Sequence, residues 1–235
     1  QLGDGSTRDL YFKREVLQVG TEQNWQTINA GDYHSLAIKS DGTLWAWGSN
    51  DKGGLGDGTT TNKDTPVQIG TDTNWQTINA GYLHSLGIKS DGTLWAWGLN
   101  LYGELGDGTS EKRYTPVQIG SEKNWQTISA GYYHSLGIKS DGTLWSWGMN
   151  SHGQLGHDAT SRRIEAPLQI GTDKDWQTIS SGERYSLALK TDGTLWSWGK
   201  NSDGQLGDGT YIDSDFPVQI GTDKDWQTIS SGERY

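Results

Sequence analysis

The 235-residue sequence contains no cysteine, so neither disulfides nor thiolate metal sites can stabilise its fold. It has four prolines, two phenylalanines and one methionine. No apolar run approaches the ~20 residues that a membrane-spanning helix requires, and we expect no membrane insertion. No signal-peptide pattern is present, which fits a cytoplasmic protein or a secreted one given without its leader.

Basic residues are also scarce. Nineteen Lys and Arg stand against 29 Asp and Glu, which gives a formal net charge of −10. Phosphate binding needs clustered Lys and Arg, whereas here the longest basic runs are pairs such as Lys112-Arg113. The composition therefore argues against a nucleic-acid partner.

Large aromatic and small residues take the place of aliphatic ones. Only 31% of residues are hydrophobic, but 13 tryptophans, 10 tyrosines and 34 glycines are present. Each tryptophan or tyrosine brings a large apolar area in a single residue. We expect a core built from aromatic and small side chains.

The sequence repeats itself with a period of 50 or 51 residues. The motif Trp-Gln-Thr-Ile recurs with its tryptophan at 25, 75, 125, 176 and 226. Repeat units cover approximately 25–74, 75–124, 125–175 and 176–225, with 1–24 and 226–235 as partial units. A period of this size indicates a propeller blade or a solenoid rung, and no segment resembles a linker. We predict a single repeat domain over 1–235.

Each unit predicts four short strands, which in the first unit cover 25–30, 34–39, 43–48 and 66–69. Alternation of side chains in 43–48 leaves neither face polar, so we expect that strand to be buried on both sides. Asp41-Gly42 predicts a tight hairpin with a primed turn, and Pro66 suits an outer edge strand. No helical period is present. The predicted fold is all-β, a β-propeller of four-stranded antiparallel blades.

The two ends of the sequence belong to one divided unit, so we predict four complete blades and a split fifth. Residues 16–19 could supply its outer strand and residues 226–231 its inner strand. Such a blade would lack its two middle strands and would expose unpaired edges. An excerpt of a longer propeller, a protein completed by association and an irregular five-bladed ring all remain possible interpretations.

Three motifs recur in fixed order: Ala-Gly-x-x-His-Ser-Leu, Ser-Asp-Gly-Thr-Leu-Trp-Ala-Trp-Gly-x-Asn and Gly-x-Leu-Gly-Asp-Gly-Thr. Together they resemble the repeat of the regulator of chromosome condensation family, over essentially all of 1–235. The resemblance implies a propeller, most often seven-bladed, that binds proteins and does not catalyse reactions. Some members act as exchange factors for a small nuclear GTPase, and a bacterial member inhibits β-lactamase. Such activities belong to individual members and do not follow from the repeat.

The predicted binding residues lie on one face of the blades. Chain direction alternates in a meander, so the turn before each His and the long loop after Trp-x-Trp-Gly share a face. That face varies between units, whereas the opposite face is nearly constant. Exposed turns can vary freely after duplication, but tyrosine and arginine on loops commonly anchor interfaces. The predicted residues are Asp32, Tyr33, Tyr82, Leu83, Leu101, Tyr102, Tyr132, Tyr133, Glu183 and Arg184.

Other motifs suggest chemistry less strongly. His34, His84 and His134 recur at the unit spacing, but the fourth and fifth units carry Tyr185 and Tyr235, which favours backbone hydrogen bonding over a metal ring. The Asp-Gly-Thr motifs, such as the one at Asp57, favour turns over calcium loops. We expect the tryptophans to form core and not sugar platforms. We predict no metal, no cofactor and no catalytic site, because no unique chemical constellation is present.

These patterns predict a non-enzymatic scaffold that binds a protein partner through the variable face. Its resemblance to Trp-rich bacterial versions of the repeat, together with its acidic charge, suggests a secreted or cell-surface module. The alternative is a structural protein that assembles with other copies of itself through open blade edges, since near-identical copies at 172–185 and 222–235 suit head-to-tail contacts. Carbohydrate binding and GTPase exchange are weaker hypotheses.

Overall fold

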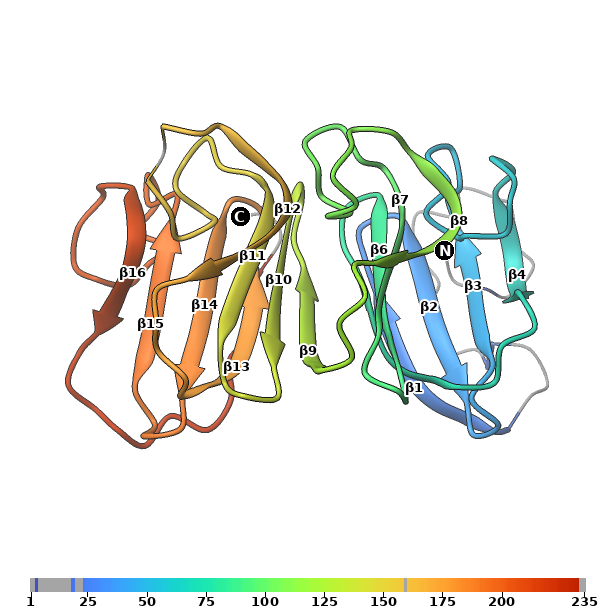
Figure 1. The fold of residues 1–235 in the computed structure, drawn as a ribbon, viewed down its shortest axis with the longest axis horizontal. Helices are drawn as coiled ribbons and strands as arrows, with labels where there is room; N and C mark the ends of the chain where they lie inside the picture. Colours follow the sequence, from blue (N-terminus) through green and yellow to red (C-terminus); the bar gives the residue numbers. More distant parts are fainter. Residues whose placement is uncertain (1–2, 4–17, 20–22, 159, 233–235) are drawn as a thin grey trace.

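The fold consists of four antiparallel sheets arranged in tandem. The computed structural model describes residues 3, 18–19, 23–158 and 160–232. Each sheet has four strands in sequence order, and consecutive sheets lie side by side (Figure 1). The described residues contain no helix, and therefore none long and apolar enough to cross a membrane. The predicted propeller architecture with four complete blades is confirmed.

The four blades have closely matching strand bounds. Blade 1 contains β1 (Trp25–Ala30), β2 (His34–Lys39), β3 (Leu44–Gly48) and β4 (Lys63–Ile69). Blade 2 contains β5 (Trp75–Ala80), β6 (His84–Lys89), β7 (Leu94–Gly98) and β8 (Arg113–Ile119). Blade 3 contains β9 (Trp125–Ala130), β10 (His134–Lys139), β11 (Leu144–Met149) and β12 (Arg163–Ile170). Blade 4 contains β13 (Trp176–Ser181), β14 (Tyr185–Lys190), β15 (Leu195–Gly199) and β16 (Ser214–Ile220).

The outer strand of blade 1 is longer than its sequence suggested. β4 begins at Lys63, three residues before Pro66. The pairing with β3 is interrupted there: Ala46 pairs with Val67, but Gly48 pairs with Lys63. Proline has no N–H to donate and is tolerated at such an irregularity of an edge strand. The prediction of an edge strand was right, and its start was wrong.

The Asp-Gly hairpin differs from the predicted primed turn. Primed turns need a positive φ in their central residues, but of the described residues only glycines have one, and Gly42 has φ 77°. The loop is Ser40-Asp41-Gly42, a three-residue connection in which glycine follows the turn. A Cβ on Gly42 would lie 2.1 Å from the Thr73 carbonyl oxygen, so glycine also permits contact with the link to the next blade.

The core lies between blades as well as within them. Leu36, Ile38 and Leu44 of blade 1 pack against Trp75 and Ile78 of blade 2. Equivalent clusters join blade 2 to blade 3 and blade 3 to blade 4. The second tryptophan of the Trp-x-Trp motif is buried there in blades 2 to 4, and Trp97, Trp147 and Trp198 are 0% exposed. The predicted aromatic core is confirmed.

The expected split fifth blade is only partly described, and one of its predicted strands is absent. Residues 16 and 17 of the proposed outer strand lie outside the described residues. Residues 226–231 form no strand. The segment still follows the repeat, because Ser231 N donates to Ser180 Oγ (2.9 Å) much as Ala80 N donates to Asn29 Oδ1 (2.7 Å). A strand requires a hydrogen-bonded neighbour, and none of the described residues supplies one here.

Candidate binding face

The four blades present two faces with different chemistry. We call the face with the turns that precede β2, β6, β10 and β14, and the long loops that follow β3, β7, β11 and β15, the loop face. The opposite face, with the Asp-Gly hairpins and the links between blades, is the hairpin face. In Figure 1 the loop face is at the top, where β9 and β13 point. Antiparallel pairing in strict order places the connections this way.

Five tyrosines of the loop face are in ring contact. We name Tyr33, Tyr82, Tyr102, Tyr132 and Tyr133 the tyrosine cluster; they come from three blades. The rings of Tyr82 and Tyr132 stack with centroids 3.7 Å apart. Tyr33 meets Tyr82 edge-on at 5.3 Å, and Tyr102 lies 5.0 Å from Tyr133. Tyr33 is 39% exposed, and the other four are half-buried.

Close approach of the inner strands brings these turns together. A Cβ on Gly81, just before Tyr82, would lie 2.5 Å from the Gly131 carbonyl oxygen. That oxygen accepts a hydrogen bond from Tyr82 N (3.2 Å). Because glycine leaves this space open, the turns of blades 2 and 3 pack directly on each other and the rings of Tyr82 and Tyr132 can stack.

The remaining predicted residues occupy different positions. Glu183 and Arg184 lie in the turn before β14, away from the aromatic contacts. Asp32 is half-buried next to Tyr33, Leu83 is half-buried, and Leu101 is 54% exposed at the tip of its loop. The tyrosines therefore form one group, and the charged pair of blade 4 belongs to another.

The second group is a set of polar contacts between blades 3 and 4. We name His152, Glu183, Arg184 and Asp213 the ionic cluster. Arg184 Nη1 donates to His152 Nε2 (3.2 Å), and His152 Nδ1 lies 2.9 Å from Asp213 Oδ2. Arginine can only donate, so Nε2 accepts and the ring proton is on Nδ1. Glu183 Oε1 lies 3.6 Å from Arg184 Nε. His152 was not among the predicted binding residues.

A buried carboxyl group that was not among the predicted binding residues contacts the backbone of Tyr102 in the tyrosine cluster. Glu104 is 0% exposed, and burial raises its pKa to about 7. Its Oε2 accepts a hydrogen bond from Tyr102 N (2.6 Å), while its Oε1 has no hydrogen-bond partner among the described residues. The signal was present in the repeat, because glutamate stands here where the other units have Gly54, Gln154 and Gln205.

Burial and the neighbouring Tyr82 raise the pKa of the Tyr133 phenol, and Tyr102 and Glu104 add to this effect. Glu104 therefore interacts electrostatically with the Tyr133 phenol, although the Glu104 side chain itself is not exposed to solvent.

The three repeated histidines connect blades. His34 Nε2 lies 2.7 Å from Ser85 Oγ, and Ser85 Oγ donates to the Gly54 carbonyl. The serine has one proton to donate, so His34 Nε2 must be the donor. His84 and His134 make the same contact with the next blade. Their predicted backbone bond is thus replaced by a side-chain bond. Among the described residues no group of three His, Cys, Asp or Glu side chains is arranged to hold a metal.

The Asp-Gly-Thr motifs form turns, as predicted. Asp57 Oδ1 accepts hydrogen bonds from Thr59 N (2.9 Å) and Thr59 Oγ1 (2.8 Å). Asn50 Nδ2 donates to the same oxygen (2.9 Å), and Asn50 Oδ1 accepts from Leu55 N. These contacts hold the long loop over the blade. The carboxylate oxygen is occupied by turn contacts within its own loop.

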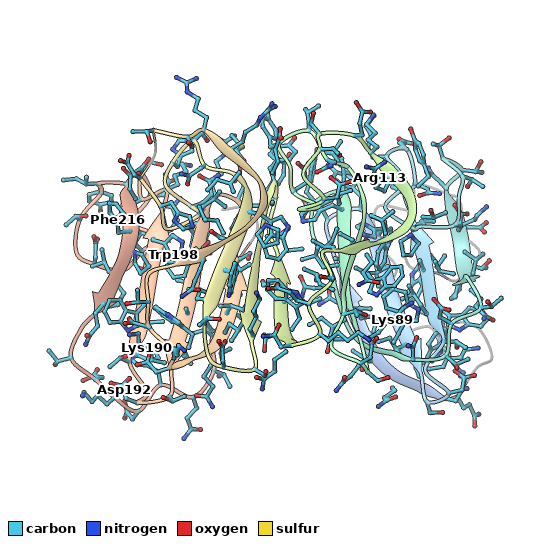
Figure 2. All side chains as sticks on the ribbon, viewed as in Figure 1. Lys89, Arg113, Lys190, Asp192, Trp198 and Phe216 are labelled. Atoms are coloured by element: carbon cyan, nitrogen blue, oxygen red, sulfur yellow. The ribbon has the colours of Figure 1, made fainter. Side chains whose placement is uncertain are left out.

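The hairpin face carries a buried lysine in each blade that the sequence analysis also missed. Lys139 Nζ lies 3.5 Å from the ring centroid of Trp145 and 2.6 Å from Glu122 Oε2. Lys89 and Lys190, labelled in the lower part of Figure 2, make the corresponding contacts in blades 2 and 4. The contacts repeat with the sequence and explain why this face is constant: they are structural.

Comparison with known proteins agrees with the architecture. The sequence model of the RCC1-like domain matches residues 1–235. Human WBSCR16 superposes with a TM-score of 0.82 at 22% identity, over 92% of this chain and 57% of that one. Prp20p from Saccharomyces cerevisiae gives 0.78 at 23% identity, over 86% of this chain and 52% of that one. The chain thus spans little more than half the length of these structures. The match over its whole length shows that the chain belongs to the RCC1-like domain family.

Proposed function

We propose that this chain is a non-catalytic scaffold that binds a protein partner through the loop face. The observation that carries the proposal is the tyrosine cluster, in which turns and a loop from three blades bring five tyrosines into contact. Tyrosine supplies a large contact area and a polar tip at low conformational cost, and it is enriched at the centres of interfaces. The rigid blades hold these side chains in place before binding.

The related structures are consistent with this proposal. Prp20p is described with binding properties to Gsp1p and histones, and in a separate structure yeast RCC1 (Prp20) is bound by Kap60. These partners are proteins. They belong to the yeast protein, and the identity between the chains is too low to transfer them.

Affinity capture from an extract of the source organism tests the proposal. The bait is compared with a Tyr82→Leu/Tyr132→Leu variant and with an Asp91→Asn/Asp141→Asn variant on the hairpin face. We expect a protein retained by the wild type and by the hairpin-face variant and lost from the tyrosine variant. Equal capture by all three baits contradicts the proposal.

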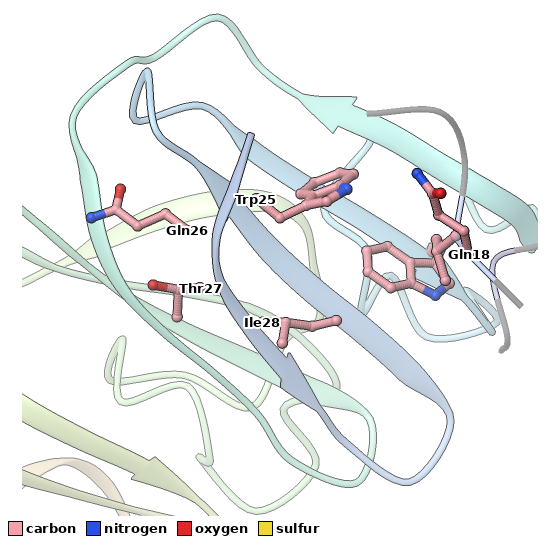
Figure 3. Close-up of a pocket in the computed structure, with 7 residues that line it drawn as sticks. Gln18, Trp25, Gln26, Thr27 and Ile28 are labelled. Carbon is pink, nitrogen blue, oxygen red and sulfur yellow. The ribbon is translucent and has the colours of Figure 1, made fainter. Parts of the chain in front are cut away.

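The second candidate is assembly with other copies, and the open side of blade 1 supports it. Ile28 is 66% exposed, whereas its counterparts Ile78, Ile128 and Ile179 are 4%, 5% and 7% exposed against the preceding blade. A cavity of about 220 Å³ lies here, lined by residues that include Trp25, Ile28 and Trp47 (Figure 3). In the other blades, the residues equivalent to Trp25 and Ile28 pack against a surface like that of Leu36 and Ile38 in the preceding blade. A blade of another copy could therefore cover this cavity with the same kind of surface.

Light scattering over a concentration series tests this candidate. Assembly predicts a mass that rises with concentration in the wild type and stays monomeric in Ile28→Lys, because the charge cannot be buried in a blade interface. Tyr132→Leu serves as the control and should assemble like the wild type. A wild type that remains monomeric throughout excludes this candidate.

We further infer a secreted or cell-surface location, on the sequence resemblance to Trp-rich bacterial repeats and the acidic charge. Fractionation of the source cells tests it. Recovery in the cytoplasm alone contradicts it.

A further inference from the structure

The tyrosine cluster and Glu104 together suggest what kind of partner the loop face binds. The rings present π-electron faces that attract cations. The loop-face turns and loops of blades 1 to 3, which carry the cluster, contain more carboxylates than lysines and arginines; the carboxylates include Asp32, Asp51 and Glu111. The chain already pairs cations with aromatic rings, since Lys139 Nζ lies 3.5 Å from the Trp145 ring centroid on the hairpin face.

Glu104 supplies an independent reason for a cation. Its Oε1 is buried and has no hydrogen-bond partner among the described residues, and its Oε2 bonds to the backbone of Tyr102. Gln154 occupies the same position in blade 3, where its amide oxygen accepts the equivalent bond from His152 N (2.9 Å). Glutamine therefore makes the loop contact equally well. Glutamate differs from glutamine here only in that it can lose a proton, and the ionised carboxylate then has no charged partner among the described residues.

We propose that the tyrosine cluster binds an arginine-rich segment of the protein partner, and that docking of its guanidinium groups is coupled to loss of the Glu104 proton to solvent. This inference rests on the proposed function of the loop face. The positive charge lies over the rings and favours the ionised form of the nearby Glu104, because the low polarity around a buried carboxylate strengthens the attraction. The proton leaves the Glu104 carboxyl for the buffer, and no covalent bond other than O–H changes.

Arginine suits this surface better than lysine. Its planar guanidinium stacks on aromatic rings, and its N–H groups, which lie in the guanidinium plane, remain able to donate hydrogen bonds at the edge of the stack. Lysine carries a compact, strongly hydrated ammonium that loses more on leaving water. The stacked Tyr82 and Tyr132, flanked edge-on by Tyr33, form a surface suited to planar groups.

Isothermal titration calorimetry with a peptide of alternating arginine and glycine tests the first half of the proposal. We expect Tyr82→Leu, which leaves the charge unchanged, to weaken binding by about fivefold, as one cation–π contact of about 1 kcal/mol implies. Asp91→Asn/Asp141→Asn on the hairpin face removes two charges, and we expect less than a twofold change. A Tyr82→Leu affinity equal to that of the wild type overturns the proposal, because binding is then only the attraction of opposite net charges.

Titrations in phosphate and in Tris at pH 7 test the second half. Released protons are taken up by the buffer, so the binding enthalpy measured for the wild type should differ between the two buffers. Since the Glu104 pKa is about 7, up to about half a proton is released per binding event, and the difference should be up to about half of the difference between the ionisation enthalpies of the two buffers. The difference should disappear in Glu104→Gln. A difference that persists in this variant assigns the proton to another group and overturns the coupling.

The two proposals can fail separately. If a captured partner depends on the tyrosines but the arginine peptide does not displace it, the loop face binds proteins and the arginine assignment is wrong. If no tyrosine-dependent partner is captured, the proposed function itself fails, whatever the peptide does.

Discussion

On the hairpin face each buried lysine of blades 2 to 4 has an aromatic ring and a carboxylate next to it, as Lys139 has Trp145 and Glu122. On the loop face the buried titratable groups have no oppositely charged partner. His34, His84 and His134 are neutral, and the Oε1 atom of Glu104 has no hydrogen-bond partner among the described residues. The hairpin face thus holds paired charges. The buried titratable groups of the loop face are instead neutral or lack an ionic partner, and its charged pairs, such as Arg184 with Glu183, are partly exposed.

This difference indicates that the two faces contribute to stability in different ways. Removal of a buried lysine from the hairpin face loses both its ring contact and its ion pair and is therefore destabilising. A buried neutral group becomes unfavourable when the pH forces it to ionise. We therefore expect mutations to be most costly on the hairpin face and pH to act mainly on the loop face.

Acid should have the largest effect. Burial lowers the pKa of His34 to about 4 and that of His84 and His134 to about 3, below the ordinary 6.5. Their contribution to stability is complete above pH 6.5 and is lost as the pH falls toward the folded values. Each should reduce the free energy of unfolding by about 3 kcal/mol between pH 6.5 and 4. Urea unfolding across this range measures it.

The control for acid is His84→Gln, which keeps a donor for Ser135 but does not titrate. It should lower the slope of stability against pH below 6.5 by about one proton. An unchanged slope would show that other groups cause the acid sensitivity.

The second effect has the opposite sign. Burial raises the Glu104 pKa from 4.5 to about 7, so its protonated form is stable in the folded state and stability falls as pH rises from 4.5 through 7. Glu104→Gln should raise the free energy of unfolding at pH 8 by about 3 kcal/mol and leave it nearly unchanged at pH 4. Denaturant unfolding at both pH values measures the difference. A gain that is equal at both pH values contradicts a titration at this site.

Removal of a lysine from the hairpin face ranks third. Lys139→Ala leaves Glu122 without its cation and the Trp125 and Trp145 rings without their contact. We expect a loss of about 2 kcal/mol in the free energy of unfolding. The matched control is Lys123→Ala, an exposed lysine 3.7 Å from Asp91, which should cost less than about 0.5 kcal/mol. Equal costs would contradict the structural role of the buried lysines.

The smallest effect on stability should come from the tyrosine cluster. Tyr132→Leu removes ring contacts of a half-buried side chain but keeps apolar area, and we expect a loss below about 1 kcal/mol. Thermal unfolding measures it. A loss as large as that of Lys139→Ala would make the cluster part of the core and would weaken the case for a binding face.

Much of the fold could be predicted because the side-chain alternation and the turn glycines indicate the same strands in every repeat unit. β1 and β2 have the predicted bounds, since their alternation and the glycine turns depend on adjacent residues. The start of β4 and the type of the Asp-Gly turn were missed, because a bulge and the φ of Asp41 depend on contacts with the neighbouring strand and blade. Residues 226–231 were expected to form a strand, which needs a partner that no local signal provides.

The sequence predicted which residues line the candidate binding face, but not which of them contact one another. The turn before each histidine was identified as the variable one, and the face followed from strand direction. That Tyr33, Tyr82 and Tyr132 meet depends on how the blades approach one another. The same holds for the contacts of His152 with Arg184 and Asp213, which lie 32 and 61 positions away in the sequence. Glu104 was overlooked because its burial cannot be read from a loop sequence of polar residues.

The sequence by itself determined that the chain is a tandem array of four-stranded blades, because period, strand alternation and turn glycines are local and repeated four times. Only the tertiary structure decided which side chains share an environment. The turn before the second strand of each blade gives stacked tyrosines between blades 2 and 3, where it reads Gly-x-x-His. In blade 4, where it reads Gly-x-x-Tyr, it joins an ionic cluster, and the packing of consecutive blades sets the distances between these turns. The tertiary structure also decided that Ile28 is exposed while its three counterparts are buried, because burial requires a preceding blade among the packed elements.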